Sequence, residues 1–205
     1  MLSIRRSPDP EDLAVAVAAI ARGQLVALPT DTVFGLAADP RNESATARVF
    51  AAKRRPRGLP LPVLVAEAAQ ARRLALRVGE QAAALMEAFW PGPLTLILEA
   101  NPGAALHLGV PNGAIALRQP DHPFALALLK ATGPLAVTSA NVTGQPPALT
   151  AREAEDQLGA AVACYIDAEP APRGIASTIV DCTGPEARLA RQGGTGQDLI
   201  RRALG

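Results

Sequence analysis

Short apolar runs and longer amphipathic stretches alternate along the chain. In the first amphipathic stretch, Leu13, Val17 and Ile20 recur at the spacing of one helix face. Asp9 is suited to cap this helix, and Gly23 ends it. The short apolar runs are typical of buried strands. The pattern predicts strands at residues 24–28, 61–65, 94–98, 114–117, 135–137, 163–166, 177–180 and 188–191, and helices from residue 10 to Gly23 and at 42–52, 67–75, 79–89, 123–131, 150–158 and 197–204.

The order of these elements predicts the fold class. The sequence has no internal repeat and no shift in composition that would mark a domain boundary. Several connections between predicted strands are too short for a helical crossover, so antiparallel neighbours are needed as well as parallel ones. Thr150 and Glu153 have the spacing of a capping box at the start of one helix. We therefore expect a single α/β domain over residues 1–205, with a twisted mixed sheet and flanking helices.

Composition narrows the classes of function. The 205 residues are 49% hydrophobic and 19% charged, a balance that argues against overall disorder. The 20 basic and 19 acidic residues give a net charge of +1, which argues against nucleic-acid binding by bulk charge. Cys164 and Cys182 are too few for a disulfide framework or a four-ligand zinc site. No apolar run is long enough for a membrane span and no signal-peptide pattern is found, so we expect a cytoplasmic protein.

A first candidate for chemistry is the segment 28–36, LPTDTVFGL. It places Thr30, Asp31 and Thr32 directly after a predicted buried strand. Sheets of the α/β class commonly bind their ligands at such strand ends, and hydroxyls with a carboxylate suit a polar ligand. The alternative is that the three side chains only satisfy the backbone of a turn.

A second candidate is the basic cluster at residues 53–57, KRRPR. Among 20 basic residues, Lys53 and Lys130 are the only lysines. The cluster follows a predicted helix, in a proline-containing loop that enters a predicted strand. Such a loop could direct Lys53 and Arg55 toward a polyphosphate, with the lysine as a point charge and the arginine as a planar fork. The alternative is an ordinary solvated run of charge.

A third candidate is the segment 138–141, TSAN, which follows another short apolar strand. Ser139 and Asn141 either present a hydroxyl and an amide to phosphates or a base, or cap the next turn. Neither a Walker-type phosphate loop nor a Gly-x-Gly-x-x-Gly fingerprint is present. His107 and His122 are isolated, and His122 is best explained as a hydrogen-bonding residue at a helix start.

Eight segments in order resemble the motifs of one protein family. They are 29–36 (PTDTVFGL), 53–56 (KRRP), 60–64 (PLPVL), 90–95 (WPGPLT), 118–123 (RQPDHP), 138–141 (TSAN), 177–181 (STIVD) and 191–193 (RQG). Each segment alone has little specificity, but the ordered set strongly resembles the YrdC family of L-threonylcarbamoyladenylate synthases. The resemblance covers residues 13–194.

The resemblance implies an α/β fold with a concave, positively charged cleft, and it implies a reaction. L-threonine, bicarbonate and ATP, with Mg²⁺ assisting the triphosphate, would give L-threonylcarbamoyladenylate and pyrophosphate. A separate transferase complex would then pass the threonylcarbamoyl group to the adenosine next to the anticodon of certain tRNAs. No metal-binding side chains and no membrane association are implied.

The resemblance also assigns site residues by position. Threonine would be held by Thr32, Arg118 and Ser177, with Arg118 on its carboxylate. ATP would be held by Lys53, Arg55, Ser139, Asn141 and Arg191, and the cations Lys53 and Arg55 near the phosphates would be catalytic.

The sequence departs from the family pattern close to these positions. Phe34 stands where many relatives have tyrosine, Leu59 where a polar residue is common, and Leu64 where some relatives have histidine. Two other hypotheses stay open: an RNA-binding or ribosome-assembly module, and a related enzyme that adenylates a different carbamate. The small net charge and the few aromatic residues disfavour the RNA-binding module, although weak contact with RNA also stays open.

Overall fold

A computed structural model describes residues 4–6, 10–170 and 172–205. The strands are β1 (Ile4–Arg6), β2 (Val26–Leu28), β3 (Gly35–Ala38), β4 (Val63–Leu64), β5 (Leu94–Glu99), β6 (Ala114–Arg118), β7 (Leu135–Ser139), β8 (Cys164–Asp167), β9 (Thr178–Asp181) and β10 (Arg188–Arg191). The helices are α1 (Pro10–Ala21), α2 (Glu43–Lys53), α3 (Ala68–Leu74), α4 (Glu80–Phe89), α5 (Pro123–Thr132), α6 (Ala151–Leu158) and α7 (Gln197–Leu204), with 3-10 turns η1 (Pro102–Ala104) and η2 (Gly159–Ala161). Every predicted strand and helix is present, whereas Asp9, the expected cap of α1, lies outside the described residues.

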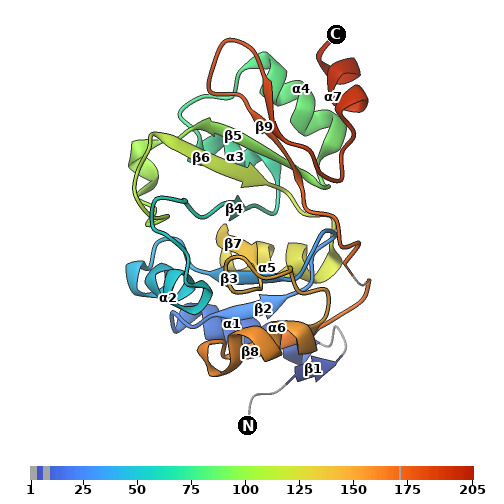
Figure 1. Cartoon of the computed structure of the whole chain (residues 1–205). Coiled ribbons are helices and arrows are strands. Elements are labelled where there is room, and N and C mark those ends of the chain that lie inside the picture. Colours follow the sequence, from blue (N-terminus) through green and yellow to red (C-terminus); the bar gives the residue numbers. More distant parts are fainter. Residues whose placement is uncertain (1–3, 7–9, 171) are drawn as a thin grey trace.

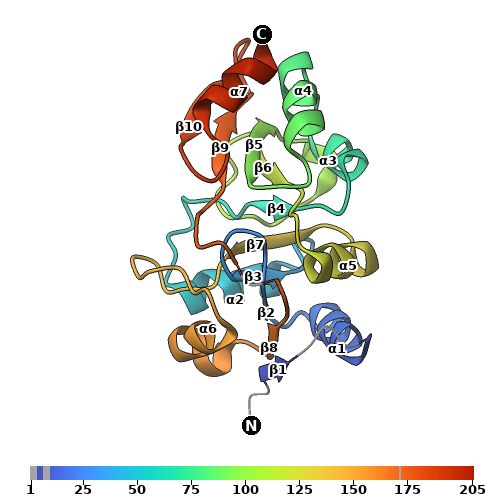
Figure 2. The same cartoon turned by 90° about the vertical axis from the view of Figure 1, so that its right-hand side faces the viewer.

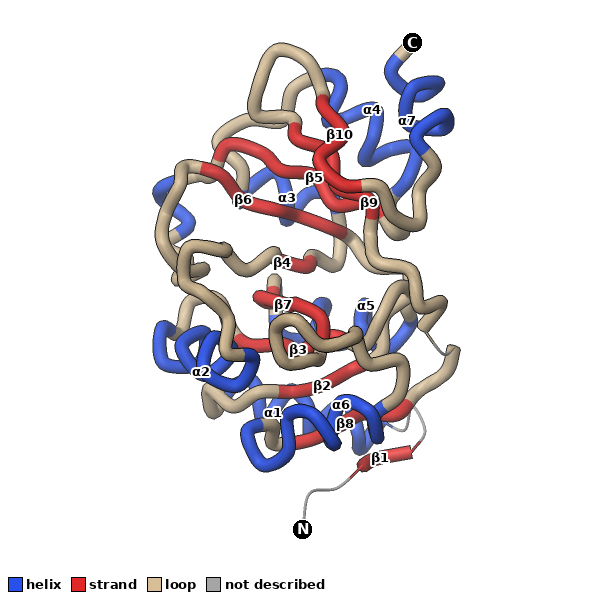
Figure 3. The backbone as a smooth tube through the Cα atoms, in the orientation of Figure 1, coloured by secondary structure: helices blue, strands red, loops and turns tan. Residues whose placement is uncertain are grey.

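The described strands form one ten-stranded sheet in the order β1-β8-β2-β3-β7-β4-β6-β5-β9-β10 (Figure 1). The pairs β1–β8, β8–β2, β4–β6 and β5–β9 are parallel, and the other neighbours are antiparallel. The predicted α/β class with a mixed sheet is therefore confirmed. The short strand β4 lies in the middle and joins a first half-sheet (β1, β8, β2, β3, β7) to a second half-sheet (β6, β5, β9, β10), as the tube in Figure 3 shows.

The first half-sheet is covered by helices on both faces. Figure 2 shows α1 and α5 on one side of it and α2 and α6 on the other. Ile20 of α1 and Leu128 of α5 belong to one buried apolar cluster. Phe50 of α2 and Ala154 of α6 belong to a second cluster on the opposite face. This half of the molecule thus has three layers, which explains why its short strands are apolar on both faces.

The second half-sheet buries one face against helices and leaves the other for the site. Leu94 and Leu96 of β5 pack in a cluster with Leu85 of α4 and Ile200 of α7. Thr95, between the two leucines, points to the opposite face because successive side chains of a strand alternate. This opposite face carries polar side chains such as Thr95 and Arg118, and it lines the pocket described below.

Strand β3 is an element that the sequence pattern did not predict. Residues 28–36 were expected to be a strand end followed by a loop, but Gly35 begins β3 between β2 and β7. Glycine and alanine are weak strand formers, so local propensity gave no signal for a Gly-Leu-Ala-Ala strand. A Cβ atom at Gly35 would lie 2.7 Å from Val137 Cγ1 of β7. The close approach of the two strands therefore requires glycine here.

Candidate active site

A pocket of about 340 Å³ lies between the two half-sheets. Its wall combines the uncovered face of the second half-sheet with loops that follow β2, α2 and β7. The lining residues are Thr30, Thr32, Val33, Phe34, Gly35, Arg55, Pro60, Pro62, Leu64, Thr95, Ala116, Arg118, Val137, Thr138, Ser139, Pro147, Ala176, Ser177, Ile179 and Arg191. Its charged lining residues are three arginines, so the pocket favours an anionic ligand.

The loop after β2 contributes an ordered pair of hydroxyls. Thr30 Oγ1 donates to the Val33 carbonyl at 2.7 Å, which uses its only hydrogen. In the 2.9 Å contact between the Thr30 and Thr32 hydroxyls, Thr32 is therefore the donor. Thr32 Oγ1 also accepts from Arg118 Nη1 at 2.9 Å. Toward a ligand, Thr32 consequently offers a lone pair and not a hydrogen.

Arg118 at the end of β6 is buried and held from several sides. Its Nε donates to the Gly92 carbonyl at 3.0 Å, and its Nη2 forms an ion pair with Asp31 Oδ1. Together with the bond from Nη1 to Thr32, these contacts use three of the five guanidinium N–H groups and leave two. Burial lowers the pKa of Arg118, and Asp31 opposes that effect. The result is a fixed cation with two free donors at the pocket wall.

Asp31 joins the loop after β2 to the turn after β6. Its Oδ1 accepts from the Arg118 guanidinium and from the backbone N–H of Asp121 at 3.1 Å. Its Oδ2 is buried and has no hydrogen-bond partner among the described residues. A charge-assisted hydrogen bond between two buried, oppositely charged side chains is strong and directional. Asp31 therefore fixes the direction of the Arg118 guanidinium.

Ser177 and Arg191 come from the segment that contains β9 and β10. The Ser177 hydroxyl lies 2.8 Å from that of Thr95. Arg191 Nη2 donates to the Ser177 carbonyl at 2.8 Å and lies 3.3 Å from the Ser177 hydroxyl. Partial burial lowers the pKa of Arg191. These bonds leave the Nη1 group of Arg191 available to a ligand.

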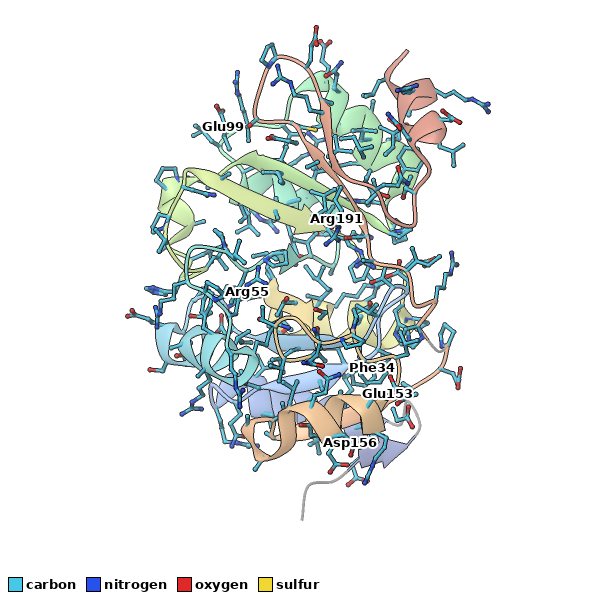
Figure 4. The ribbon with its side chains drawn as sticks, in the orientation of Figure 1. Phe34, Arg55, Glu99, Glu153, Asp156 and Arg191 are labelled. Atoms are coloured by element: carbon cyan, nitrogen blue, oxygen red, sulfur yellow. The ribbon has the colours of Figure 1, made fainter. Side chains whose placement is uncertain are left out.

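Arg55 stands at the other side of the pocket, in the loop after α2. Its Nε donates to the Leu59 carbonyl at 2.9 Å and its Nη2 to the Pro60 carbonyl at 3.1 Å, while burial lowers its pKa. Figure 4 shows that Arg55, Arg191 and Phe34 come from three different parts of the fold. The two arginines can therefore contact different groups of one extended ligand.

Lys53 does not face the pocket. It is the last residue of α2 and is only 2% exposed. Its ammonium donates to the carbonyls of Ser139 and Asn141 at 2.5 and 2.6 Å and lies 3.4 Å from Asn141 Oδ1. Burial, with a smaller effect of Arg55, lowers the pKa of Lys53 to about 8. Its three donors are thus directed at the protein itself.

Asn141 is likewise committed to its own loop. Its amide nitrogen donates to the carbonyls of Val142 and Gln145 at 2.9 and 2.7 Å. Together with Lys53, it fixes the backbone that carries Ser139. Neither Lys53 nor Asn141 lines the pocket itself.

The structure brings together six of the eight residues that the family resemblance assigned: Thr32, Arg55, Arg118, Ser139, Ser177 and Arg191. Thr30, a candidate from its place at a strand end, also lines the pocket, as does Thr95, which was not a candidate. The signal for Thr95 was a threonine between two leucines of a predicted strand, where a half-buried sheet face is expected. Asp31 was named as a candidate, but its partner Arg118, 87 positions away, could not be read from local spacing.

Two further properties of the described residues bear on the site. They contain no group of three or more His, Cys, Asp or Glu side chains able to hold a metal ion. Among them, no helix has both the length and the apolar character needed to cross a membrane.

The fold and the site define a class of α/β protein in which an arginine- and hydroxyl-lined pocket lies between two halves of one mixed sheet. A family model named Sua5/YciO/YrdC, described as "Telomere recombination", matches residues 18–193. The chain belongs to this family. A protein of Mycobacterium tuberculosis is 43% identical over 201 residues, covering 96% of this chain and 93% of the relative. A Vibrio vulnificus protein named threonylcarbamoyl-AMP synthase is 35% identical over 185 residues, covering 89% and 98% of the two chains.

A solved structure agrees with these relatives. Pyrococcus abyssi Sua5 in complex with L-threonine superposes with a TM-score of 0.90 at 33% identity, covering all of this chain. The H234A/Y235A variant of the same protein gives a TM-score of 0.93 at 34% identity. This chain spans 61% to 64% of the length of the Pyrococcus abyssi chains.

Proposed function

We propose that this chain makes L-threonylcarbamoyladenylate and pyrophosphate from L-threonine, bicarbonate and ATP. The observation that carries the proposal is Arg118, a buried and fixed guanidinium with two free N–H groups at a wall shared with Arg55 and Arg191. A planar pair of donors is the preferred partner of a carboxylate. The names of the relatives and the threonine complex of Pyrococcus abyssi Sua5 support the same assignment.

The amino acid occupies the side of the pocket near the second half-sheet. Arg118 binds its carboxylate with the two free donors. Thr32 accepts a hydrogen bond from the amino group, since its own hydrogen is already used in the bond to Thr30. Ser177, which directly precedes β9 and is held by Arg191 and Thr95, contacts the same substrate.

ATP occupies the side near α2 and β7. Arg55 and Arg191 contact its phosphates, and Ser139 contacts the nucleotide from the end of β7. Lys53 and Asn141 hold the turn that presents Ser139 and so act on ATP through it. Mg²⁺ enters with the triphosphate, bound mainly by phosphate oxygens, as is usual for this ion.

The reaction needs orientation and neutralised charge more than a covalent nucleophile. The nitrogen of the neutral threonine amine bonds to the bicarbonate carbon, and one of its protons leaves together with a bicarbonate hydroxyl as water. An oxygen of the resulting carbamate then bonds to the α-phosphorus of ATP as the bond to pyrophosphate breaks. Cations fixed around the pocket stabilise the charge that accumulates on the phosphates, and the shared pocket keeps the reactants at bonding distance. We propose that a separate transferase uses the product on tRNA.

The test measures pyrophosphate release by the purified chain with ATP, Mg²⁺, bicarbonate and each amino acid in turn. Release should require L-threonine, with L-serine a weak substitute, and threonylcarbamoyladenylate should be detected by mass spectrometry. Release that depends on another amine-containing substrate would instead favour a different carbamate-adenylating enzyme. No release with any of them would contradict the proposal and favour the RNA-binding hypothesis.

A further inference from the structure

Thr95 lies at the centre of the uncovered sheet face, beside Arg118. Leu96 of β5 is paired with Leu117 of β6, so the next antiparallel position places Thr95 opposite Arg118. On its other side Thr95 is paired with Ile179 of β9. Thr95 is 5% exposed, and it lines the pocket together with Arg118 and Ile179. Neither the sequence motifs nor the proposed mechanism has given this residue a role toward substrate.

The hydroxyl pair formed by Thr95 and Ser177 has one hydrogen to spare. One hydroxyl donates to the other across 2.8 Å, and either direction is possible. Among the described residues, the only other hydrogen bond to either hydroxyl comes from Arg191, which is itself a donor. Whichever hydroxyl donates within the pair, the other therefore keeps its hydrogen for a ligand. The pair thus presents both a donor and acceptor lone pairs to the pocket.

The spacing fits a hydroxyl next to a carboxylate. Arg191 Nη2 lies 3.3 Å from the Ser177 hydroxyl, and Arg191 is close enough to Arg118 for its charge to lower the Arg118 pKa. A substrate carboxylate on Arg118 therefore leaves the substituents of the β-carbon near the Thr95–Ser177 pair. Ala116 and Ile179 line the same part of the sheet and offer apolar surface beside the two hydroxyls.

We propose that Thr95, paired with Ser177, is a specificity-determining residue that recognises the β-hydroxyl of the amino acid, with Ala116 and Ile179 against its methyl group. This inference rests on the proposed function, because Arg118 must hold the carboxylate. A site built to hydrogen-bond a substrate hydroxyl rejects analogues that lack it, because its buried polar groups are then left unpaired. Removal of the Thr95 hydroxyl should therefore weaken this rejection selectively.

The experiment compares wild type, Thr95→Val and the control Thr95→Ser. Valine keeps the branched shape and strand preference of threonine and replaces its hydroxyl with a methyl group. The kcat/KM for L-threonine is divided by that for L-2-aminobutyrate, which has the same carbon chain without the hydroxyl. Thr95→Val should lower this ratio by at least about tenfold, whereas Thr95→Ser should keep it. An equal loss with both amino acids, or no change in the ratio, would overturn the proposal.

A binding measurement separates this inference from the proposed reaction. Isothermal calorimetry gives the same ratio from the dissociation constants of L-threonine and L-2-aminobutyrate, without any turnover. A ratio that falls in Thr95→Val supports the role of Thr95 even where no pyrophosphate is released, an outcome that contradicts only the reaction. A ratio that Thr95→Val leaves unchanged contradicts the role of Thr95, whatever the turnover.

Discussion

At the scale of single residues, Lys53 shows that a cation in a basic cluster can be bonded to the protein itself and not exposed to the pocket. A lysine in a basic cluster after a helix was expected to face phosphate. Instead its ammonium is enclosed by the carbonyls of Ser139 and Asn141, and it connects α2 to the turn after β7. Buried carbonyls need donors, and a long flexible side chain at a helix end can supply them. Only the three-dimensional neighbourhood distinguishes this role from direct binding.

Replacement of the two cations should therefore give similar losses of activity with different effects on structure. We expect Lys53→Ala and Arg55→Ala each to lose about 2–4 kcal/mol of transition-state stabilisation, or about 30- to 1000-fold in kcat/KM. Amide hydrogen exchange at residues 140–145 should accelerate in Lys53→Ala only, since Arg55 bonds to a different loop. Equal exchange in both variants would argue against a positioning role for Lys53, and unchanged turnover in both would show that neither cation contributes to catalysis.

The lowered pKa of Lys53 predicts a pH dependence. Burial lowers it to about 8, so the ammonium is the dominant form below that pH and the neutral amine above it. The neutral amine has one hydrogen fewer for the acceptors around it. Activity should accordingly be present below about pH 8 and fall as the pH rises through this value. Lys53→Gln, which donates but does not titrate, should be less active and lack this alkaline decline; a decline that persists there would assign it to another group.

At the scale of elements, the close approach of the β10 end to the β9 start shapes the pocket. Gly193 follows β10 and lies against the backbone of residues 176–178. A Cβ atom there would lie 2.2 Å from the Ala176 carbonyl oxygen and 2.4 Å from the Ser177 carbonyl carbon. The Gly193 N–H also donates to Thr178 Oγ1 at 2.9 Å. A glycine is thus needed to keep Arg191 against Ser177.

Gly193→Ala should push these two segments apart. We expect it to destabilise the fold by about 1–3 kcal/mol, as overpacking usually does, and to lower activity because Ser177 and Arg191 are displaced. Gly196→Ala is the matched control, because no atom lies within 4 Å of a Cβ built there. Urea unfolding and pyrophosphate release measure the two effects. A Gly193→Ala variant with unchanged stability and turnover would show that the backbone relaxes without cost.

Element by element, helices were predictable where local chemistry defines their ends. Helices α2, α5 and α6 are capped by Asn42, His122 and Thr150, whose side chains accept hydrogen bonds from backbone N–H groups of the first turn. In the capping box of α6, the Glu153 carboxylate accepts a hydrogen bond from the N–H of Leu149 rather than from the N–H of Thr150. Strand β3 was missed because its Gly-Leu-Ala-Ala sequence is stabilised by neighbours on both sides and not by propensity. Tertiary pairing, which propensity does not contain, decides such strands.

At the scale of the whole molecule, the site depends on an order of strands that local patterns do not encode. Strand β9, late in the sequence, lies beside β5, and β8 lies between β1 and β2. This order brings Thr32, Arg118 and Ser177 to one pocket, although the hydrogen-bonded pair Thr32 and Arg118 is 86 positions apart. Family resemblance indicated which residues converge. The directions of their side chains, above all that of Lys53, required the structure.

Two ligands in one pocket should stabilise the molecule separately. A ligand that binds only the native state adds about 2.7 kcal/mol at a hundred times its Kd, which is about 5–10 °C in Tm for a domain of this size. Arg118→Lys keeps a cation beside Asp31 but loses the planar fork, so it should lose the increase caused by L-threonine and retain that caused by ATP. Arg55→Lys, the matched change on the other side, should lose the increase caused by ATP and retain that caused by L-threonine. Thermal unfolding of both variants with each ligand tests this division, and equal losses for both ligands in either variant would contradict it.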